Sequence, residues 1–489
     1  MKKHIIMKNK FLLFIGVMFA VVACDPSEFD DLNVDPRQVT ETPTATLLTY
    51  SLTKLPYTTF NAPGRNEAGF STNYLDFYAQ YLSEGPYPAS SLYSTRNLDW
   101  ADWYRGPLYN LQTIINLNND DSPLASIGNG SKNNQVAVAR ILKAYYFWFL
   151  TDIYGDLPYS EALQGNEVLQ PSYDPQEEIY DDLFKELTEA QAMINESEAG
   201  VTGDILLHGD MGMWKKFANT TRLFMALRLM ERDPARAEAE MTAALSAGVL
   251  EEGEDITYQF LGGDPNHWNP WYENYSNDNR NDYAISNTLA DYMIETEDPR
   301  VWVYAENLSG QVRPLSYGSN QARQIPGSFS RIGDQLRADN TNVPVFTYAQ
   351  VLFAQAEAAE RELISGSPAE LYNDAIEASW KFWGVYDETA FNNFIADAGV
   401  AYSDANGLQQ IMKQKWVHQY LNGFEAWTDW RRTGYPELTP AEDATQTGGI
   451  PRRMGYPSNA KALNATGYEA AVARQGADDN FTRVWWDVQ

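Results

Sequence analysis

The chain has very few of the side chains on which most catalytic and metal sites depend. Its 489 residues include one cysteine, Cys24, and four histidines that are far apart in the sequence. A single cysteine excludes a disulfide within the chain, so packing must hold the fold together. HExxH, GxSxG, P-loop and glycine-rich nucleotide motifs are absent, which leaves zinc, triad and nucleotide chemistry without sequence support. We therefore expect no metal and no cofactor; a structural Ca²⁺ ion on an acidic loop stays open.

Basic side chains are also scarce. Lysine and arginine number 36 against 66 aspartates and glutamates, which gives a formal net charge of −30. Such a surface repels nucleic acid and other polyanions, so we expect no nucleic-acid partner and no acidic polysaccharide ligand. A glycoside hydrolase needs only two carboxylates, and pairs of carboxylates occur throughout so acidic a chain. That enzyme class is therefore not excluded by inspection.

The one cysteine follows a segment typical of export. Four lysines precede an apolar run over residues 11–23, which suits a signal peptide but is too short to span a bilayer. The order Val-Val-Ala-Cys at residues 21–24 resembles a bacterial lipobox. It predicts removal of residues 1–23 and lipid attachment at Cys24, whose acyl chains would hold the protein to a membrane. The alternative is an ordinary secretory signal with an incidental cysteine. The acidic, turn-rich residues 24–43 then read as a tether.

Helical patterns recur in pairs along the rest of the chain. Apolar residues at helical spacing, with prolines and capping residues at the starts, indicate helices. The predicted segments are residues 99–117, 135–151, 175–192, 210–230, 234–247, 348–365 and 367–383. Their pitch of roughly 34 residues suggests tetratricopeptide-like hairpins. We expect a mainly α fold.

Two stretches lack this helical pattern. Residues 252–345 and 431–489 are rich in glycine, asparagine, aspartate, proline and aromatics, and long irregular segments of this kind usually carry function. We expect residues 44–489 to form one composite domain. Its helical scaffold would cover about 44–250 and 345–425, with the loop-rich insert at about 252–345.

Seven motifs along the chain resemble the SusD/RagB family of outer-membrane lipoproteins of Bacteroidetes, in the SusD-like, starch-binding-associated branch. They occur in the order typical of that family and span nearly the whole chain. The motifs lie at residues 29–36, 144–159, 214–219, 298–300, 354–358, 424–432 and 451–457.

The resemblance implies a fold and a role. The fold would be about four tetratricopeptide-like hairpins that support an irregular, loop-rich ligand face. Members of the family are binding proteins rather than enzymes, and they are lipid-anchored at the cell surface in the outer membrane. They cover a SusC-like TonB-dependent transporter, capture an oligosaccharide or sometimes a peptide, and pass it to the pore. A peptide-capturing, RagB-like protein is therefore one alternative, and a surface glycoside hydrolase is another.

Aromatic residues point to the candidate ligand site. The chain has 14 tryptophans and 30 tyrosines, more than a core of this size needs. Pyranose rings stack on Trp and Tyr, while carboxylates, amides and guanidinium groups bind sugar hydroxyls. The densest such segment contributes Trp268, Trp271, Tyr272, Tyr275, Asp278 and Arg280, and an earlier loop contributes Tyr87, Tyr93 and Trp100.

Each of these sites has a structural alternative. Asn269-Pro270 and the pair Arg280 and Asp282 can be scaffold, in which case one of the two nearby tryptophans belongs to the core. Trp100 can likewise serve packing alone. The negative charge favours a neutral glycan, and we expect a β-glucan such as laminarin.

Overall fold

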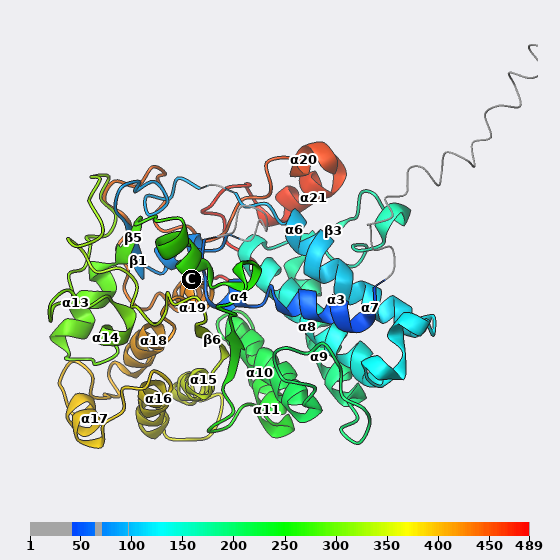
Figure 1. Ribbon diagram of the computed structural model, residues 1–489, viewed down its shortest axis with the longest axis horizontal. Coiled ribbons are helices and arrows are strands. Elements are labelled where there is room, and N and C mark those ends of the chain that lie inside the picture. Colours follow the sequence, from blue (N-terminus) through cyan, green and yellow to red (C-terminus); the bar gives the residue numbers. More distant parts are fainter. Residues whose placement is uncertain (1–41, 64–70, 96, 489) are drawn as a thin grey trace, which may run out of the picture. The chain divides into compact units, whose positions relative to one another are not determined.

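The computed structural model describes residues 42–63, 71–95 and 97–488. The predicted signal segment, Cys24 and nearly all of the predicted tether lie outside the described residues. The chain divides into two units, Met1–Pro43 and Thr44–Gln489, and the second unit is mostly helical (Figure 1). The expected mainly α fold is thus confirmed. Within the described residues, no helix combines the length and apolar character required to cross a membrane.

Among the described residues, nine α-helices precede residue 248, apart from short 3₁₀ and π turns. They are α3 (Thr44–Leu52), α4 (Pro56–Thr59), α5 (Tyr74–Tyr78), α6 (Ala101–Trp103), α7 (Tyr109–Asn119), α8 (Lys132–Tyr154), α9 (Gln176–Met193), α10 (Met211–Leu229) and α11 (Pro234–Ala247). The helices α7 and α8 pack together, as do α10 and α11, and α9 contacts both α8 and α10.

The remaining scaffold helices follow the insert. They are α15 (Tyr348–Glu360), α16 (Pro368–Phe382), α17 (Glu388–Ile395), α18 (Gly407–His418), α19 (Gly423–Thr433), α20 (Ala460–Leu463) and α21 (Ala465–Gln475). Figure 1 shows α15 and α16 beside α10 and α11, so that the hairpins follow one another along one side. Because α20 and α21 lie within 431–489, the expectation of a wholly irregular C-terminal part is corrected.

Local capping explains why several helices begin where the sequence predicts. The Asp210 carboxylate accepts a hydrogen bond from the Met213 amide at 3.0 Å, and the Ser367 hydroxyl accepts one from the Glu370 amide at 3.3 Å. Each satisfies a backbone donor that the first turn leaves unpaired. The helix α11 has the bounds predicted for it, 234–247.

Three short antiparallel ribbons join distant segments. At the base of the insert, β4 (Ile256–Gln259) pairs with β6 (Asn342–Phe346). Outside the insert, β2 (Leu157–Pro158) pairs with β3 (Tyr173–Asp174). The strand β1 (Leu82–Glu84) pairs with β5 (Tyr283–Ile285), so Glu84 lies opposite Tyr283. The loop after β1 therefore lies beside the segment before β5.

The insert is more ordered than its composition predicts. Besides its three strands it contains α12 (Pro270–Tyr272), α13 (Asn287–Glu295) and α14 (Val301–Tyr304). The insert predicted as loop-rich over about 252–345 thus contains short regular elements among its loops. These elements are short, and their partners are distant in the sequence, so local periodicity does not reveal them.

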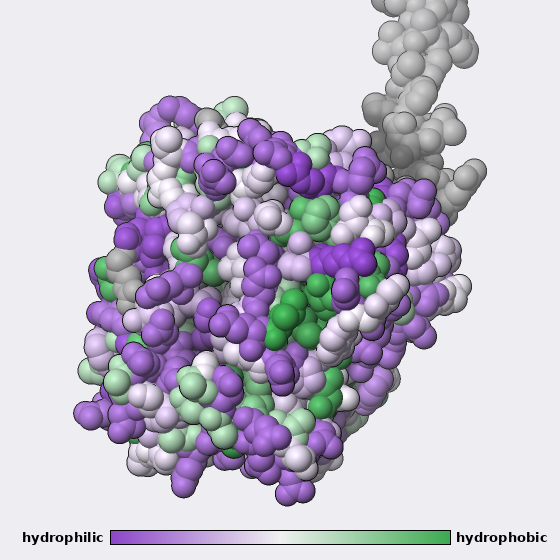
Figure 2. Space-filling model, turned by 90° about the vertical axis from the view of Figure 1, so that its left-hand side faces the viewer, coloured by the Kyte–Doolittle hydropathy of each residue, from purple (hydrophilic) through white to green (hydrophobic). Residues whose placement is uncertain are grey.

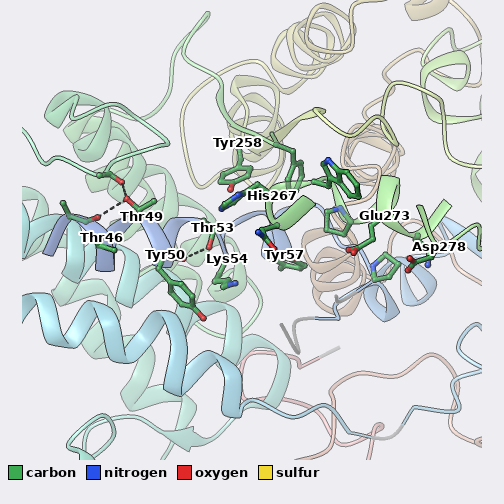
Figure 3. Close-up of a pocket in the computed structure, with 18 residues that line it drawn as sticks. Thr46, Thr49, Tyr50, Thr53, Lys54, Tyr57, Tyr258, His267, Glu273 and Asp278 are labelled. Carbon is green, nitrogen blue, oxygen red and sulfur yellow. Dashed lines mark hydrogen bonds between the residues drawn. The ribbon is translucent and has the colours of Figure 1, made fainter. Parts of the chain in front are cut away.

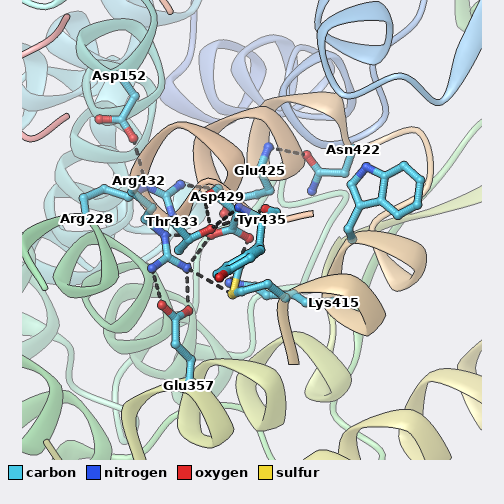
Figure 4. A network of polar contacts seen from close by, with 12 residues as sticks. Asp152, Arg228, Glu357, Lys415, Asn422, Glu425, Asp429, Arg432, Thr433 and Tyr435 are labelled. Carbon is cyan, nitrogen blue, oxygen red and sulfur yellow. Dashed lines mark hydrogen bonds and ion pairs between the residues drawn. The ribbon is translucent and has the colours of Figure 1, made fainter. Parts of the chain in front are cut away.

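Buried ion pairs hold α19 against the other helices (Figure 4). On one side, the guanidinium group of Arg228 from α10 lies 3.1 Å from an Asp152 carboxylate oxygen on α8 and 2.7 Å from a Glu425 oxygen on α19. All three side chains are buried. The pairing joins three helices at one fully desolvated cation.

A second group of ion pairs lies on the other side of α19. Arg432 pairs with Glu357 of α15 through two hydrogen bonds and with Asp429 at 2.6 Å, while Lys415 of α18 lies 2.9 Å from Asp429. Burial alone would raise the pKa of Asp429, but Lys415 and Arg432 hold it well below its usual range. The carboxylate therefore stays charged, and each buried charge has a partner.

We expect the substitution Glu357→Gln to lower the free energy of unfolding by about 3–5 kcal/mol, because it leaves the buried Arg432 cation undercompensated. Urea unfolding followed by circular dichroism measures this loss. The control is Lys132→Ala in the exposed pair with Asp121, where a change within about 1 kcal/mol is expected. Equal losses in both variants would contradict the structural role given to the network.

A buried histidine gives the fold a pH dependence. Burial, with Arg300 and Lys415 nearby, lowers the pKa of His418 to about 3. The unfolded chain takes up this proton near pH 6.5, whereas the folded protein does not. Stability should therefore fall as the pH is lowered from about 6.5 towards 3, by up to about 1.4 kcal/mol per pH unit from this residue, with no contribution above that range.

The variant His418→Gln tests this pH dependence. Its urea midpoint, measured between pH 7 and 4, should fall less steeply with acidification than that of the wild type. Curves that stay parallel for the two proteins over this range would refute the assignment.

Candidate functional site

One side of the insert and the first helices of the domain enclose a cleft of about 1060 Å³, called here the main cleft (Figure 3). One wall comes from α3 and α4, and the other comes from β4 and residues 266–278. Its lining residues are Ala45, Thr46, Thr49, Tyr50, Thr53, Lys54, Tyr57, Pro63, Gly203, Tyr258, Phe260, Asn266, His267, Trp268, Pro270, Glu273, Asn274 and Asp278.

The buried face of α3 packs on the scaffold, and this packing determines which residues of the helix face the cleft. Thr44, Leu48, Ser51 and Leu52 are buried. The Tyr146 hydroxyl of α8 donates to the Ser51 carbonyl oxygen at 2.6 Å, and this bond fixes the helix on the scaffold. The helical repeat then turns the intervening residues, including Thr49, towards the cleft.

The wall on the insert depends on one buried asparagine. The Asn269 side chain accepts a hydrogen bond from the Trp271 amide at 3.0 Å and donates to the carbonyl oxygens of Leu336 and Ala338 at 2.8 and 3.0 Å. It therefore caps α12 and ties it to the return segment of the insert. Asn269 is scaffold, as the structural alternative proposed.

Trp268 is the predicted aromatic residue that reaches the main cleft. Its side chain is half-buried, its indole N–H donates to the Gly262 carbonyl oxygen at 2.8 Å, and its ring meets that of Tyr272 edge-on at 5.2 Å. Both contacts hold the indole in place. The nearly buried rings of Tyr57, Tyr258 and Phe260 add further aromatic surface to the lining.

The polar groups of the cleft are mostly hydroxyls and acids. Glu273 and Asp278 lie at one end, and Lys54 comes from the opposite wall (Figure 3). The His267 imidazole lies 2.6 Å from the Asp264 carboxylate. Burial raises the pKa of Tyr258 to about 12, so its hydroxyl stays neutral at physiological pH. Such a set suits a neutral, hydroxyl-rich ligand better than a polyanion.

The segment Glu273–Asn277 forms a π-helical turn. Turns of this kind are rare and often occur at functional sites. Here the turn places Glu273 and Asn274 along the main cleft and ends at Asp278. The backbone therefore departs from a regular α-helix in the segment that brings Glu273 and Asp278 to the main cleft.

A second hollow, called here the side hollow, adjoins the same segment. It has a volume of about 770 Å³ and is lined by Pro86, Tyr87, Asn279, Arg280, Asn281, Asp282, Gln324 and Ile325. The β1–β5 pairing brings its two predicted residues together. Tyr87 is 67% exposed, while Arg280 pairs with Asp282 at 2.7 Å and keeps half its side chain exposed. The predicted scaffold pair of Arg280 is thus present, and both predicted side chains still reach the surface.

Three predicted residues lie in the core instead. Trp271 is fully buried against Tyr275 and Tyr283, with ring centroids 6.0 and 5.4 Å away. Tyr275 is 3% exposed, and its hydroxyl donates to the Tyr283 carbonyl oxygen at 2.8 Å. Tyr93 is also buried, and its hydroxyl oxygen accepts a hydrogen bond from the Ala441 amide at 3.1 Å. The expectation that these three rings are displayed is corrected.

Trp100 lies apart from the other predicted residues. It is half-buried against the rings of four tyrosines, nearest Tyr154 at 5.0 Å. It lines a separate hollow of about 310 Å³ formed with Tyr104, Arg105 and residues 158–171. The structure does not bring it into the main cleft or the side hollow.

The sequence did not predict the wall that α3, the turn after it and α4 form on the main cleft. Residues 46, 49, 50, 53, 54 and 57 recur at spacings of three and one, which is the signature of one helix face. Because this face is polar and aromatic, apolar periodicity does not reveal it.

Among the described residues, no group of three or more histidine, cysteine, aspartate or glutamate side chains is arranged to hold an ion. Figure 2 shows that hydrophilic residues cover most of the side that faces left in Figure 1, with hydrophobic residues grouped in a few areas. The lining of the main cleft combines aromatic rings with hydroxyls and carboxylates, groups that can contact a ligand through stacking and hydrogen bonds.

Comparisons with known proteins give a consistent result. A SusD-like family model described as "Starch-binding associating with outer membrane" matches residues 36–457. No curated protein sequence matches the chain.

Similar solved structures include three of particular use. A chitin-binding protein is 29% identical, with a TM-score of 0.78, over 91% of this chain and 100% of that chain. A chitin-binding SusD homolog from Flavobacterium johnsoniae is 25% identical, with a TM-score of 0.76, over 91% and 99%. A SusD-like protein from Bacteroides thetaiotaomicron is 21% identical, with a TM-score of 0.76, over 91% and 99%, and shows similarity of fold.

The two neighbouring tryptophans should respond differently to truncation. Trp271→Ala removes a fully buried ring and should cost about 3–5 kcal/mol of unfolding free energy. Trp268→Ala removes a half-exposed ring and should cost clearly less. Chemical denaturation of both variants measures the difference, and a Trp268→Ala loss as large as that of Trp271→Ala would show that Trp268 is core as well.

Proposed function

Because the chain belongs to the SusD-like family of starch-binding proteins that associate with the outer membrane, we propose that it captures a neutral glycan in the main cleft at the cell surface. One observation carries this proposal: the half-exposed indole of Trp268 shares the cleft with the hydroxyls of α3 and the carboxylates of Glu273 and Asp278. An aromatic face for the sugar ring and polar groups for its hydroxyls are the two contacts that a glycan needs. Tyr87 and Arg280 extend the same surface into the side hollow.

The ligand class follows from charge and from the comparisons. The net charge of −30 and the two cleft carboxylates oppose acidic polysaccharides. Two of the similar structures are of chitin-binding proteins at 29% and 25% identity. Chitin oligosaccharides are thus the first ligand to test, and laminarin, the β-glucan suggested by the sequence, is the second. Both are neutral and β-linked.

The proposed role includes an anchor and a partner. Lipid attachment at Cys24 would hold the protein in the outer membrane, and the acidic tether would give it reach. The captured glycan would pass to a SusC-like TonB-dependent transporter. Affinity for a short glycan should be modest, about −4 to −8 kcal/mol, because a solvated cleft recovers little surplus free energy per sugar ring.

The protein is proposed to bind without catalysis. A glycoside hydrolase would use two carboxylates across the scissile bond, and Glu273 and Asp278 are the acids in the main cleft. Incubation with each retained polysaccharide should release no reducing ends. Steady release that Glu273→Gln abolishes would instead establish a hydrolase.

Native affinity electrophoresis of residues 25–489 tests glycan capture. Gels that contain glycol chitin, laminarin, starch or alginate should retard the protein in one neutral glycan only. Trp268→Ala should weaken the retardation roughly tenfold in apparent affinity, since it removes the stacking surface.

The matched control is Trp302→Ala. Trp302 is 50% exposed on α14 and does not line the main cleft, so its variant should migrate like the wild type. Retardation in alginate would contradict the neutral-glycan assignment. Absence of retardation in all gels, together with binding to immobilised peptides, would favour the RagB-like alternative.

A further inference from the structure

The main cleft is long in one direction. Its labelled residues extend from Thr46 at one end, past Tyr50 and Lys54, to Glu273 and Asp278 at the other (Figure 3). Its volume of about 1060 Å³ lies just above the range of roughly 300–1,000 Å³ typical of small-ligand pockets. The stacking residue Trp268 and the acids belong to the insert, whereas α3 lines the cleft on the opposite wall. A ligand that contacts only the insert leaves the α3 part unfilled.

The α3 wall carries hydroxyls whose own donors are already used. The Thr49 hydroxyl lies 2.7 Å from the Gly203 carbonyl oxygen and 3.0 Å from the Ala45 carbonyl oxygen, and its single proton is shared between these two acceptors. Just after the end of α3, the Thr53 hydroxyl donates to the Tyr50 carbonyl oxygen at 2.7 Å. Each oxygen keeps lone pairs that can accept a further hydrogen bond. Sugar hydroxyls are donors of the matching kind. The wall is therefore suited to a hydroxyl-rich chain laid along the helix.

Tyr50 supplies an aromatic face on the same wall. Its side chain is 42% exposed, and the Lys54 ammonium group lies 4.7 Å from its ring centroid. This contact on the helix surface restricts the ring. Burial and the nearby Asp102 raise the pKa of Tyr50, so its hydroxyl keeps its proton and can donate. The ring thus offers a stacking surface and a polar edge at a point separate from Trp268.

We propose that the α3 wall is a second subsite of the main cleft, with Tyr50 as its stacking residue, which binds the distal sugars of an extended glycan chain. This inference rests on the proposed function and specifies its ligand as a chain rather than a single sugar or a disaccharide. A short glycan occupies the part next to Trp268. A longer glycan reaches Tyr50 as well, and its second contact is intramolecular once the first has formed.

Isothermal titration with chito-oligosaccharides and laminari-oligosaccharides of two and six sugars tests the subsite. In the wild type, the six-sugar ligand of the retained series should bind at least tenfold more tightly than the two-sugar ligand. Tyr50→Ala should weaken six-sugar binding roughly three- to tenfold and so reduce the ratio of the two affinities. Trp268→Ala should weaken both lengths and preserve that ratio.

Two control variants distinguish the effect of the Tyr50 ring from the effects of its hydroxyl and of removing an exposed tyrosine elsewhere. Tyr50→Phe keeps the stacking face and should retain most of the ratio. Tyr109→Ala removes a tyrosine that is 47% exposed on α7, outside the lining of the main cleft, and should change neither affinity. Thermal unfolding of every variant checks that the fold is intact.

The outcomes distinguish this inference from the proposed function. Binding that does not depend on chain length, or an unchanged ratio in Tyr50→Ala, would overturn the second subsite while leaving glycan capture in place. An equal loss in Tyr109→Ala would also overturn it. Absence of binding by both series at both lengths, together with absence of retardation in every neutral-glycan gel, would remove the proposed function itself.

Discussion

The buried charges around α19 are the constraint on which the rest of the structure depends. Desolvating Arg228 and Arg432 costs several kcal/mol per ion unless each meets its carboxylates in good geometry. Those carboxylates come from α8, α15 and α19, so the helices have one arrangement in which every charge is paired. The helix α19 in turn packs on α4 and α5, and the Gly423 amide at its start donates to the Asp76 carboxylate of α5 at 3.1 Å. The segments that lead to the candidate site are thereby placed by a network remote from it.

The insert uses its aromatic residues for two different purposes. Trp271 packs against Tyr275 and Tyr283, and the β1–β5 ribbon pairs Tyr283 with Glu84 outside the insert. These contacts fix the segment on the rest of the domain. Trp268, three residues before Trp271, faces the main cleft. The same short segment therefore anchors itself and displays a ring. Because the anchoring rings are buried, they hold the segment in place while part of the Trp268 ring stays accessible.

Sequence alone could predict the helices better than the site. Periodic apolar stripes and caps such as Asp210 and Ser367 are local signals, so α10, α11 and α16 were found near their true bounds. Whether Trp268 or Trp271 is buried depends on Tyr283 and on residues 336–338, which pack there only in the fold. The wall on α3 was missed for a related reason: its residues gain meaning only when the insert lies opposite them. The overall fold was predicted from the resemblance of seven motifs to the family, because those motifs reflect tertiary packing that the spacing of apolar residues does not show.

A cleft built from two walls that are distant in the sequence suits the proposed capture and release of a glycan chain. Each wall alone offers a shallow surface with one accessible stacking ring and a few hydroxyl contacts, so each contact with sugar is weak. A chain that spans both walls gains from the second contact without paying again for association. In the proposed function, release would then need only the loss of one contact at a time, and the proposed transporter could compete for one end of the chain and remove it stepwise. A modest affinity per sugar would therefore suit the proposed delivery, because each contact could be broken separately.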